Sequence, residues 1–272
     1  KPSKKSWFKW SQSQRAQRKL FNLLDCIVTN NEPLLDFVRH AGISTRVEII
    51  PNGVDPQRFY PADDQQQRQT IRDTLGIAAS DIMITTVGGI MPRKGSHLLL
   101  EAWAQLAVEF PHVHLVLVGP RKDLEQPGLK NFRNQLRKSV STSGAPERVH
   151  FTGLCKNVEE YQRASDIFVL PSEREGMPNS VLEAMASRVA VIVTPFKGLS
   201  HDLGTPGTHF LLCDRNVTDL ASALRLLLKN PAQRSKFAAQ GYQWIRENMN
   251  IERSLDRYAA LYHELAAAHK TE

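Results

Sequence analysis

The sequence lacks long apolar runs and has few cysteines. No uninterrupted apolar stretch reaches the roughly 18 residues that a membrane-spanning helix needs, and no secretory signal pattern opens the chain. Cys26, Cys155 and Cys213 are far apart and odd in number, which argues against a disulfide framework and indicates reduced thiols in the cytoplasm. Because no His/Cys spacing typical of zinc occurs, we expect no structural zinc site.

Recognisable nucleic-acid modules are also absent. The sequence has neither zinc-finger spacing nor an aromatic RNP-type strand, although its net charge is +7 and much of the excess lies near the start and between Arg121 and Arg148. A basic excess of this kind suits nucleic acid, acidic lipid or a phosphorylated substrate, and composition does not choose among them. We expect no nucleic-acid partner, and a steep salt dependence of binding to DNA or RNA would indicate one.

The chain begins with a basic and aromatic segment. Lys1 to Trp10 contains four lysines together with Trp7, Phe8 and Trp10, and no initiating Met precedes it. One interpretation is peripheral contact with an anionic membrane surface. The other, which the shortness of the segment favours, is a solvated loop or a surface that a further domain covers. We expect the chain to be part of a longer protein.

Periodicity predicts an α/β protein. Before residue 60 we expect helices at Arg15–Leu24 and Glu32–His40 and strands at Asp25–Thr29 and Val47–Ile50; Asp63–Gln69 reads as a linker ahead of a helix at Thr70–Leu75. Strands are then expected at Ile82–Val87, His114–Val118, Val149–Thr152, Ile167–Leu170, Ala190–Val193 and Phe210–Leu212. Helices are expected at Ser96–Glu109, Leu129–Ser139, Val158–Ala164, Val181–Ser187, Val217–Leu228, Ala232–Glu247 and Ser254–Ala268. Alternation of this kind predicts a parallel sheet with right-handed crossovers.

The most informative stretch runs from Ser172 to Met185, S-E-R-E-G-M-P-N-S-V-L-E-A-M. It joins a buried strand to a helix, at the place where open α/β sheets bind ligands. Glu175 and Glu183 are its candidate functional carboxylates. Two plainer interpretations remain: Ser180 and Glu183 form a capping box that only starts the helix, and Glu175 is a solvated loop charge.

A second candidate site is the glycine-rich turn V-G-G-I-M-P-R-K-G, from Val87 to Gly95. Paired glycines allow close approach of a ligand, and Arg93 and Lys94 can neutralise a diphosphate held on free backbone amides. The plainer alternative is a βα turn carrying two solvated cations. The turn is not a Walker loop, because G-x-x-x-x-G-K-[S/T] is absent.

Together these motifs resemble the family-4 retaining glycosyltransferases (glycosyl transferases group 1). Leu170 to Ala186 follows the family's strand, P-S, E-G-x-P-x-x-x-x-E-A-M-A pattern, and the stretch from Asp25 to Pro61 resembles the end of its N-terminal domain. The resemblance implies an α/β fold with the Rossmann-like parallel sheet of a GT-B C-terminal domain and a partial N-terminal Rossmann domain. Residues 1–54 would be the remnant and crossover, and 55–272 the nucleotide-sugar-binding domain with its C-terminal helices.

The resemblance also implies roles for single residues. Glu175, which would hold sugar hydroxyls, and Lys94, on the departing diphosphate, would be catalytic, and Glu183 would bind the ribose. The other donor-binding positions would be Arg93, Gly88, Gly89, Gly176, Met177, Pro178, Asn179, Ser180 and Phe151. The family has Arg where this chain has Gly89, with Arg93 as a displaced substitute, and Cys-Gly where it has Ser187-Arg188, so we expect the helix to lose its left-handed terminator.

The implied reaction is transfer of a hexose from a nucleoside-diphosphate sugar to a saccharide or lipid-linked acceptor, with retention of configuration and without metal or other cofactor. Such a protein would serve cell-envelope polysaccharide or glycolipid synthesis in the cytoplasm, including the inner face of the membrane. Since the family's catalytic apparatus spans both domains, we expect this part alone to transfer sugar poorly. The alternatives are a non-catalytic nucleotide-binding regulatory or scaffold domain, and a glycosidase using Glu175 and Glu183 as an acid/base pair about 5–10 Å apart.

Overall fold

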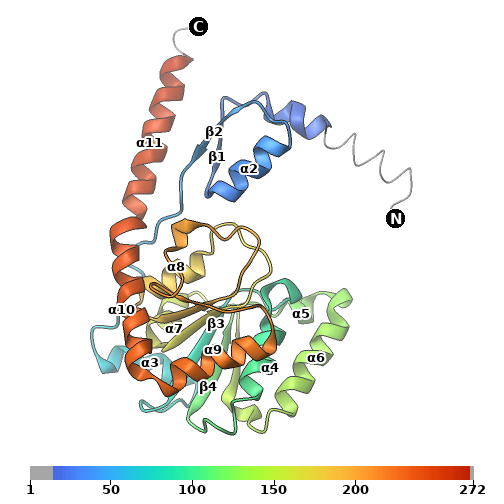
Figure 1. Ribbon diagram of the computed structural model, residues 1–272, viewed down its shortest axis with the longest axis vertical. Helices are drawn as coiled ribbons and strands as arrows, with labels where there is room; N and C mark the ends of the chain where they lie inside the picture. The colour runs from blue at the N-terminus through green and yellow to red at the C-terminus, as the bar shows by residue number, and fades with distance from the viewer. Residues whose placement is uncertain (1–14, 270–272) are drawn as a thin grey trace. The chain divides into compact units, whose positions relative to one another are not determined.

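The computed structural model describes residues 15–269, so the basic segment Lys1–Trp10 lies outside the described residues. The described chain forms two compact units (Figure 1). The first contains residues 15–52 and 252–269, and the second contains residues 53–251. The residues of the last helix therefore group with the N-terminal segment, whereas the sequence interpretation assigned them to the second domain.

The first unit contains a two-stranded parallel sheet. Strands β1 (Cys26–Thr29) and β2 (Arg46–Ile49) are connected by helix α2 (Glu32–His40), and residues 15–21 are also helical. Helix α2 begins after Asn31, whose side chain accepts a hydrogen bond from the Leu34 amide at 3.0 Å. Helix α11 (Ile251–Ala268) closes the chain, and the guanidinium of Arg257 donates to the Ile49 carbonyl. The β-α-β order predicted for this segment is confirmed.

The second unit is built on a six-stranded, wholly parallel sheet. Its strands are β3 (Ile82–Val87), β4 (Val113–Val118), β5 (Val149–Gly153), β6 (Ile167–Leu170), β7 (Ala190–Val193) and β8 (Leu211–Leu212). They lie in the order β5-β4-β3-β6-β7-β8. The longer helices are α3 (Gln65–Thr74), α4 (Ser96–Ala104), α6 (Lys130–Ser141), α7 (Val158–Ala164), α8 (Asn179–Ala186), α9 (Val217–Lys229) and α10 (Pro231–Asn248). The predicted strands and nearly all predicted helices are present within a few residues.

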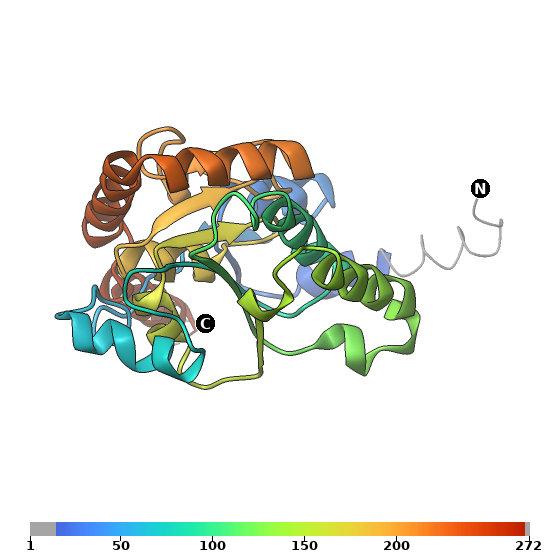
Figure 2. The ribbon, with the colours of Figure 1, turned by 90° about the horizontal axis from the view of Figure 1, so that it is seen from below.

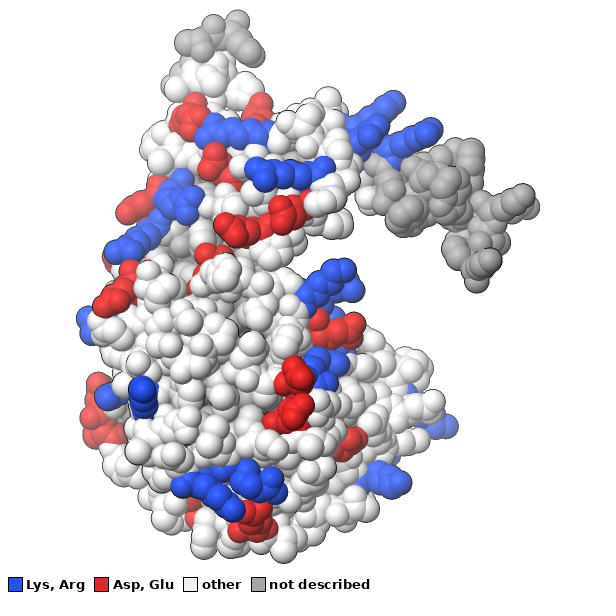
Figure 3. Space-filling view, in the orientation of Figure 1, with Lys and Arg blue, Asp and Glu red and all other residues white. Residues whose placement is uncertain are grey.

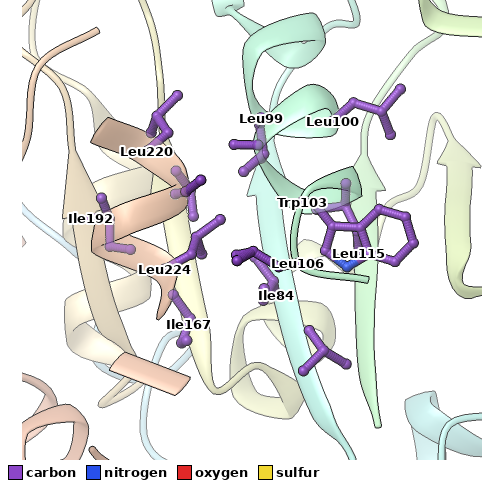
Figure 4. Close-up of a cluster of buried hydrophobic side chains, with 14 of the residues drawn as sticks. Ile84, Leu99, Leu100, Trp103, Leu106, Leu115, Ile167, Ile192, Leu220 and Leu224 are labelled. Carbon is purple, nitrogen blue, oxygen red and sulfur yellow. The ribbon is translucent and has the colours of Figure 1, made fainter. Parts of the chain in front are cut away.

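Alternating strand residues supply both faces of this sheet. In β4, Leu115 and Leu117 join one buried cluster and Val116 and Val118 join another, because successive side chains point to opposite faces. The first cluster packs strand residues such as Ile84 against helices α4 and α9 (Figure 4). Its labelled members are Ile84, Leu99, Leu100, Trp103, Leu106, Leu115, Ile167, Ile192, Leu220 and Leu224.

Helices cover both faces of the sheet. Helices α4, α6 and α9 pack together on one face, while α3, α7 and α8 form the layer on the other, with α10 against α8 and β7. In Figure 2 the orange helix α9 and the cyan helix α3 lie on opposite sides of the strands. With both faces buried, ligands have access to the sheet mainly at its edges and at the ends of its strands.

The strand order contains one reversal. From β3 the chain steps outward through β4 to β5, then returns to the other side of β3 with β6 and steps outward again through β7 to β8. In open α/β sheets, ligands bind beyond the carboxyl ends of the strands at such a reversal. The glycine-rich turn follows β3 and the acidic stretch follows β6. The topology therefore brings the two candidate motifs to one place.

The predicted linker Asp63–Gln69 was partly wrong, because helix α3 already begins at Gln65. Asp64 caps it, accepting a hydrogen bond from the Gln67 amide at 2.8 Å, and glutamine is compatible with a helix. The helix is anchored by Arg72, only 2% exposed, whose guanidinium lies 2.5 Å from a carboxylate oxygen of Asp166. This buried ion pair, which periodicity does not reveal, fixes the helix against the strand that precedes the acidic stretch.

Candidate functional site

The segment that follows β6 is held by backbone hydrogen bonds to two other loops. We call residues 171–178 the acidic loop. The Glu173 amide donates to the Arg93 carbonyl at 2.9 Å, and the Glu175 amide donates to the Lys197 carbonyl at 3.2 Å. The Lys197 amide returns a bond to the Glu173 carbonyl at 2.9 Å. The acidic loop therefore lies between the glycine-rich turn and the loop after β7, with its backbone satisfied on both sides.

Two glycines make this arrangement possible. Gly95 has φ +70°, and a Cβ there would lie 2.1 Å from the Pro171 carbonyl oxygen. Gly198 has φ +107°, and a Cβ there would lie 2.1 Å from the Glu175 carbonyl oxygen. Neither distance is compatible with a side chain, so both positions require glycine for close backbone approach as well as for their left-handed conformation.

Lys94 and Glu175 meet across the two loops. The Lys94 ammonium lies 2.6 Å from a carboxylate oxygen of Glu175, and the two side chains are 21% and 11% exposed. Glu175 is thus a largely buried, paired carboxylate, and its interpretation as a solvated loop charge is wrong. A cation and an acid that face the same point at the sheet's reversal can bind a ligand that has both phosphate and hydroxyl groups.

Arg93 is directed elsewhere than the sequence interpretation assumed. Its guanidinium donates to the Arg174 carbonyl at 2.6 Å and lies 3.8 Å from Glu175. The side chain is 45% exposed and lies along the acidic loop. Arg93 therefore supports the acidic loop, because its guanidinium is hydrogen-bonded to a backbone carbonyl of that loop.

The glycine-rich turn is tied to the loop that follows β4. The Gly88 amide donates to the Val118 carbonyl at 2.8 Å and the Ile90 amide to the Pro120 carbonyl at 2.9 Å. Gly88 has φ +143°, and the Lys94 side chain passes beside it, with Cε 3.4 Å from the place a Cβ would take. Gly88 therefore leaves room for the Lys94 side chain.

Helix α8 does not begin with the capping box that its sequence offers. It begins at Asn179 after Pro178, no side chain caps it, and Ser180 lies inside its first turn. The Ser180 carbonyl instead accepts a hydrogen bond from the Gln162 side chain at 3.2 Å. The capping interpretation of Glu183 is therefore wrong, and that carboxylate is available for another role.

Burial raises the pKa of Glu183 above its ordinary value; the nearby Arg58 guanidinium opposes this shift and the Glu159 carboxylate adds to it. The electrostatic neighbours of Glu183 thus differ from those of Glu175. Arg58 is itself paired with Glu159 at 2.8 Å. A partly buried acid in the second turn of α8, near an arginine, can accept hydrogen bonds from ligand hydroxyls.

The remaining predicted positions divide into two groups. Met177 and Pro178 are buried and Met177 belongs to a core cluster, so only their backbone can face a ligand, whereas Gly176, Asn179 and Ser180 are accessible at least in part. Phe151 lies in β5, with the Arg121 guanidinium 4.3 Å from the centre of its ring. That face of the ring is therefore covered by a cation.

The structure brings Gly88, Lys94 and Glu175 together, and it places the Arg93 guanidinium on the backbone of the acidic loop. It also shows one position that the sequence interpretation missed as a contributor, Gly198, which lies against the Glu175 carbonyl. Gly198 stands in the loop after β7, where a glycine in a K-G-L-S stretch was a detectable signal.

Two histidines lie at the opposite end of the strands from this site. His114 and His150 are near the amino ends of β4 and β5, their ring nitrogens are 3.1 Å apart, and His114 also contacts Asp81 at 3.2 Å. Within residues 15–269, no cluster of three or more His, Cys, Asp or Glu side chains is arranged to hold a metal ion. In the same part of the chain, no helix combines the length and the apolar character needed to cross a membrane.

Charged side chains are mixed on the visible face of the molecule. In Figure 3 groups of Lys and Arg lie beside groups of Asp and Glu. Ion pairs such as Arg58–Glu159 and Arg225–Glu109 also join charges of opposite sign. A mixed surface of this kind gives a weaker field than a continuous basic stripe would.

Known proteins resemble this chain over most of its length. A D-inositol 3-phosphate glycosyltransferase from Geodermatophilus obscurus is 29% identical over 257 residues, which cover 90% of this chain and 54% of that protein. The C-terminal domain of a glycosyl transferase group 1 protein from Francisella tularensis is 30% identical, with a TM-score of 0.65, and covers 73% of this chain and 100% of its own. Anabaena Alr3699/HepE in complex with UDP has a TM-score of 0.81 at 20% identity and covers 93% of this chain and 68% of its own.

The chain spans about half the length of the curated relatives it matches. The likeness to solved glycosyltransferase structures confirms the predicted α/β fold class. Residues 1–58 match the family described as Glycosyltransferase Family 4, and residues 67–244 match the one described as Glycosyl transferases group 1. The second match includes both candidate motifs and well over half of the residues, so this chain belongs to the glycosyl transferases group 1 family.

Proposed function

We propose that this chain is the donor-binding part of a retaining glycosyltransferase that moves a hexose from a nucleoside-diphosphate sugar to an acceptor. The observation that carries the proposal is the Lys94–Glu175 pair, which lies beside the Gly88–Gly89 turn at the reversal of the sheet. Family membership supports it, as do the inositol-phosphate glycosyltransferase named above and the Anabaena protein whose structure contains UDP.

In this proposal, different residues bind the diphosphate, the sugar and the ribose of the donor. The Lys94 ammonium and the Gly89 amide would hold the diphosphate, since a cation and an amide suit its charge. The neighbouring Gly88 and Ile90 amides already donate to carbonyls at or just after the end of β4. Glu175 would accept hydrogen bonds from hydroxyls of the sugar. Glu183, in its partly buried position beside Arg58, would accept those of the ribose.

The transfer breaks the bond between C1 of the sugar and the diphosphate and forms a bond from C1 to the acceptor oxygen, while the acceptor's proton passes to the departing diphosphate. Negative charge grows on the diphosphate as that bond breaks. A fixed ammonium at this point, Lys94, stabilises the transition state more than the ground state. In this scheme Lys94 balances the charge that grows on the diphosphate and the diphosphate takes up the acceptor's proton. We therefore propose that the protein uses no metal or other cofactor.

Nucleotide-dependent stabilisation tests the proposal. UDP, GDP and ADP are added separately to the protein and the free energy of unfolding is measured; a ligand at about 100 times its dissociation constant adds roughly 2.7 kcal/mol. We expect one nucleotide to stabilise the protein and the Glu183→Ala variant to lose most of that effect. No stabilisation by any of the three would contradict donor binding.

A non-catalytic nucleotide-binding domain is the second candidate, and Gly89, which stands where the family has an arginine, is the observation that favours it. Both candidates bind nucleotide, but only a transferase moves sugar. A radiolabelled nucleotide-sugar assay on the full-length protein with saccharide and lipid-linked acceptors separates them. Product formation supports the transferase, and binding without product supports the regulatory or scaffold domain.

We further propose that the acceptor is a saccharide or lipid-linked saccharide, handled in the cytoplasm at the inner face of the membrane. The four lysines and three aromatic residues of the segment Lys1–Trp10 support this placement. Co-sedimentation with vesicles of anionic lipid tests it. We expect binding that falls when residues 1–10 are deleted, whereas equal binding of both forms would contradict a role for this segment.

A further inference from the structure

We propose that Lys122 is the second cation of the diphosphate site. Its side chain lies beside Gly89, as the side chain of Lys94 lies beside Gly88. This inference rests on the proposed donor binding and names a residue for it outside the two sequence motifs. Lys122 begins the short helix α5 (Lys122–Glu125), which follows the loop after β4.

A lysine side chain passes beside each of the two glycines of the turn. A Cβ at Gly88 would lie 3.4 Å from Cε of Lys94, and a Cβ at Gly89 would lie 3.2 Å from Cγ of Lys122. Position 89 therefore has no side chain of its own, and the stem of Lys122 occupies the space into which one would project. A ligand held by this turn would have a lysine side chain beside each glycine.

Backbone hydrogen bonds fix Lys122 in this position. The Ile90 amide donates to the Pro120 carbonyl at 2.9 Å, and the Asp123 amide donates to the Ile90 carbonyl at 3.1 Å. Gly119 approaches so closely that a Cβ there would lie 2.3 Å from the Gly88 carbonyl oxygen. The glycine-rich turn and the loop that carries Lys122 therefore form one unit.

Neighbouring side chains hold this loop further. Asp123 is fully buried and accepts two hydrogen bonds from the Arg121 guanidinium, both at 2.8 Å. The Asp123 carbonyl also accepts from Arg133 at 3.2 Å. Thus the residue next to Lys122 is rigidly placed, and only the end of the lysine side chain needs to move to reach a ligand.

The present partner of Lys122 is easily replaced. Its ammonium pairs with Glu125, and the two side chains are 37% and 51% exposed. Exposed pairs of this type contribute little to stability, whereas a diphosphate offers several strongly charged oxygens. Arg93, the other cation near this turn, has its guanidinium on the Arg174 carbonyl. Lys122 is therefore better placed than Arg93 to act as the second phosphate ligand.

Calorimetry with inorganic pyrophosphate and with the best-binding nucleoside diphosphate tests the proposal. We expect Lys122→Met to weaken both affinities about tenfold, the loss of one charge-assisted contact. Lys138→Met, the same change at an exposed lysine of α6, is the matched control and should stay within twofold of the wild type. A thermal unfolding scan verifies that both variants fold.

The outcomes are separable. If the wild type binds diphosphate and Lys122→Met binds it within twofold as well, the assignment of Lys122 is overturned and the donor-binding proposal stands. An equal loss in Lys122→Met and Lys138→Met also overturns it, because the effect is then one of net charge. If the wild type binds no diphosphate, the proposed function fails and the role of Lys122 fails with it.

Discussion

The ammonium of Lys94 and the carboxylate of Glu175 lie 2.6 Å apart, so in the absence of ligand each neutralises the other. The two residues come from loops that follow adjacent strands, β3 and β6. A donor sugar-nucleotide would separate them by offering phosphate to the lysine and hydroxyls to the acid. A nucleoside diphosphate without sugar would have only the phosphate to offer.

This pairing predicts that Glu175 lowers the protein's affinity for the nucleoside diphosphate that remains after sugar transfer. Glu175→Gln removes the competitor of the phosphate for Lys94, so we expect the nucleoside diphosphate to bind about three- to tenfold more tightly. The nucleotide-sugar should gain less, because the glutamine is a weaker acceptor for its hydroxyls. Calorimetry with both ligands gives the ratio. Glu173→Gln, an exposed neighbour in the same loop, should leave that ratio unchanged; an unchanged ratio in Glu175→Gln would refute the prediction.

Glu183 predicts a stability that depends on pH. Burial raises its pKa above the ordinary 4.5, with Arg58 opposing and Glu159 adding to the shift. For an acid whose pKa is raised on folding, the stabilising contribution is full below the ordinary pKa and is lost as pH rises through the folded value. Glu183→Gln should therefore raise the free energy of unfolding at pH 7.5, with the gain shrinking as pH falls toward 4.5. Urea unfolding at several pH values measures it, and a gain independent of pH would contradict the assignment.

Arg188 predicts a stabilising substitution. The expected loss of a left-handed terminator after α8 was wrong, because Arg188 itself adopts φ +58° and its amide donates to the Met185 carbonyl. A side chain makes that conformation unfavourable, so Arg188→Gly should increase the free energy of unfolding by about 1 kcal/mol. Arg188→Ala keeps a Cβ and is the control. Equal stability of the two variants in urea unfolding would show that the backbone is not strained there.

Gly198 predicts a loss of donor binding without loss of fold. Gly198→Ala would press a methyl group against the Glu175 carbonyl and displace Glu175 from Lys94, so we expect affinity for nucleotide-sugar to fall about tenfold or more. Gly207→Ala is a matched control, because Gly207 has φ +78° with open space around it. That variant carries the backbone strain alone and should bind normally. Equal affinities of the two variants would disprove the positioning role.

Much of the fold followed from periodicity. Runs such as Val113–Val118, apolar in nearly every position, predict strands buried on both faces, and Gly or Pro between runs marks the turns. The contact between Lys94 and Glu175 was predictable only in outline. Periodicity predicts parallel strands, and the family resemblance identifies the two motifs. That β3 and β6 are neighbours depends on the strand order of the sheet, which the sequence pattern does not reveal.

Other features depend on tertiary packing and could not be predicted. Ser180 and Glu183 have capping-box spacing, yet α8 begins earlier, at Asn179. The stem of Lys122 crosses Gly89 because two loops distant in sequence are joined by backbone hydrogen bonds. Arg188 takes a conformation normally left to glycine because the chain must turn into a buried strand, β7, directly afterwards.

The contact between Gly95 and Pro171 affects how mutagenesis of the lysine-glycine pair should be interpreted. Since a Cβ at residue 95 would overlap a carbonyl oxygen at the base of the acidic loop, any substitution there moves the loop that carries Glu175. Loss of activity in a Gly95 variant would consequently reflect a rearranged backbone. Of the two residues Lys94 and Gly95, only Lys94 can be changed to measure a direct contribution to ligand affinity.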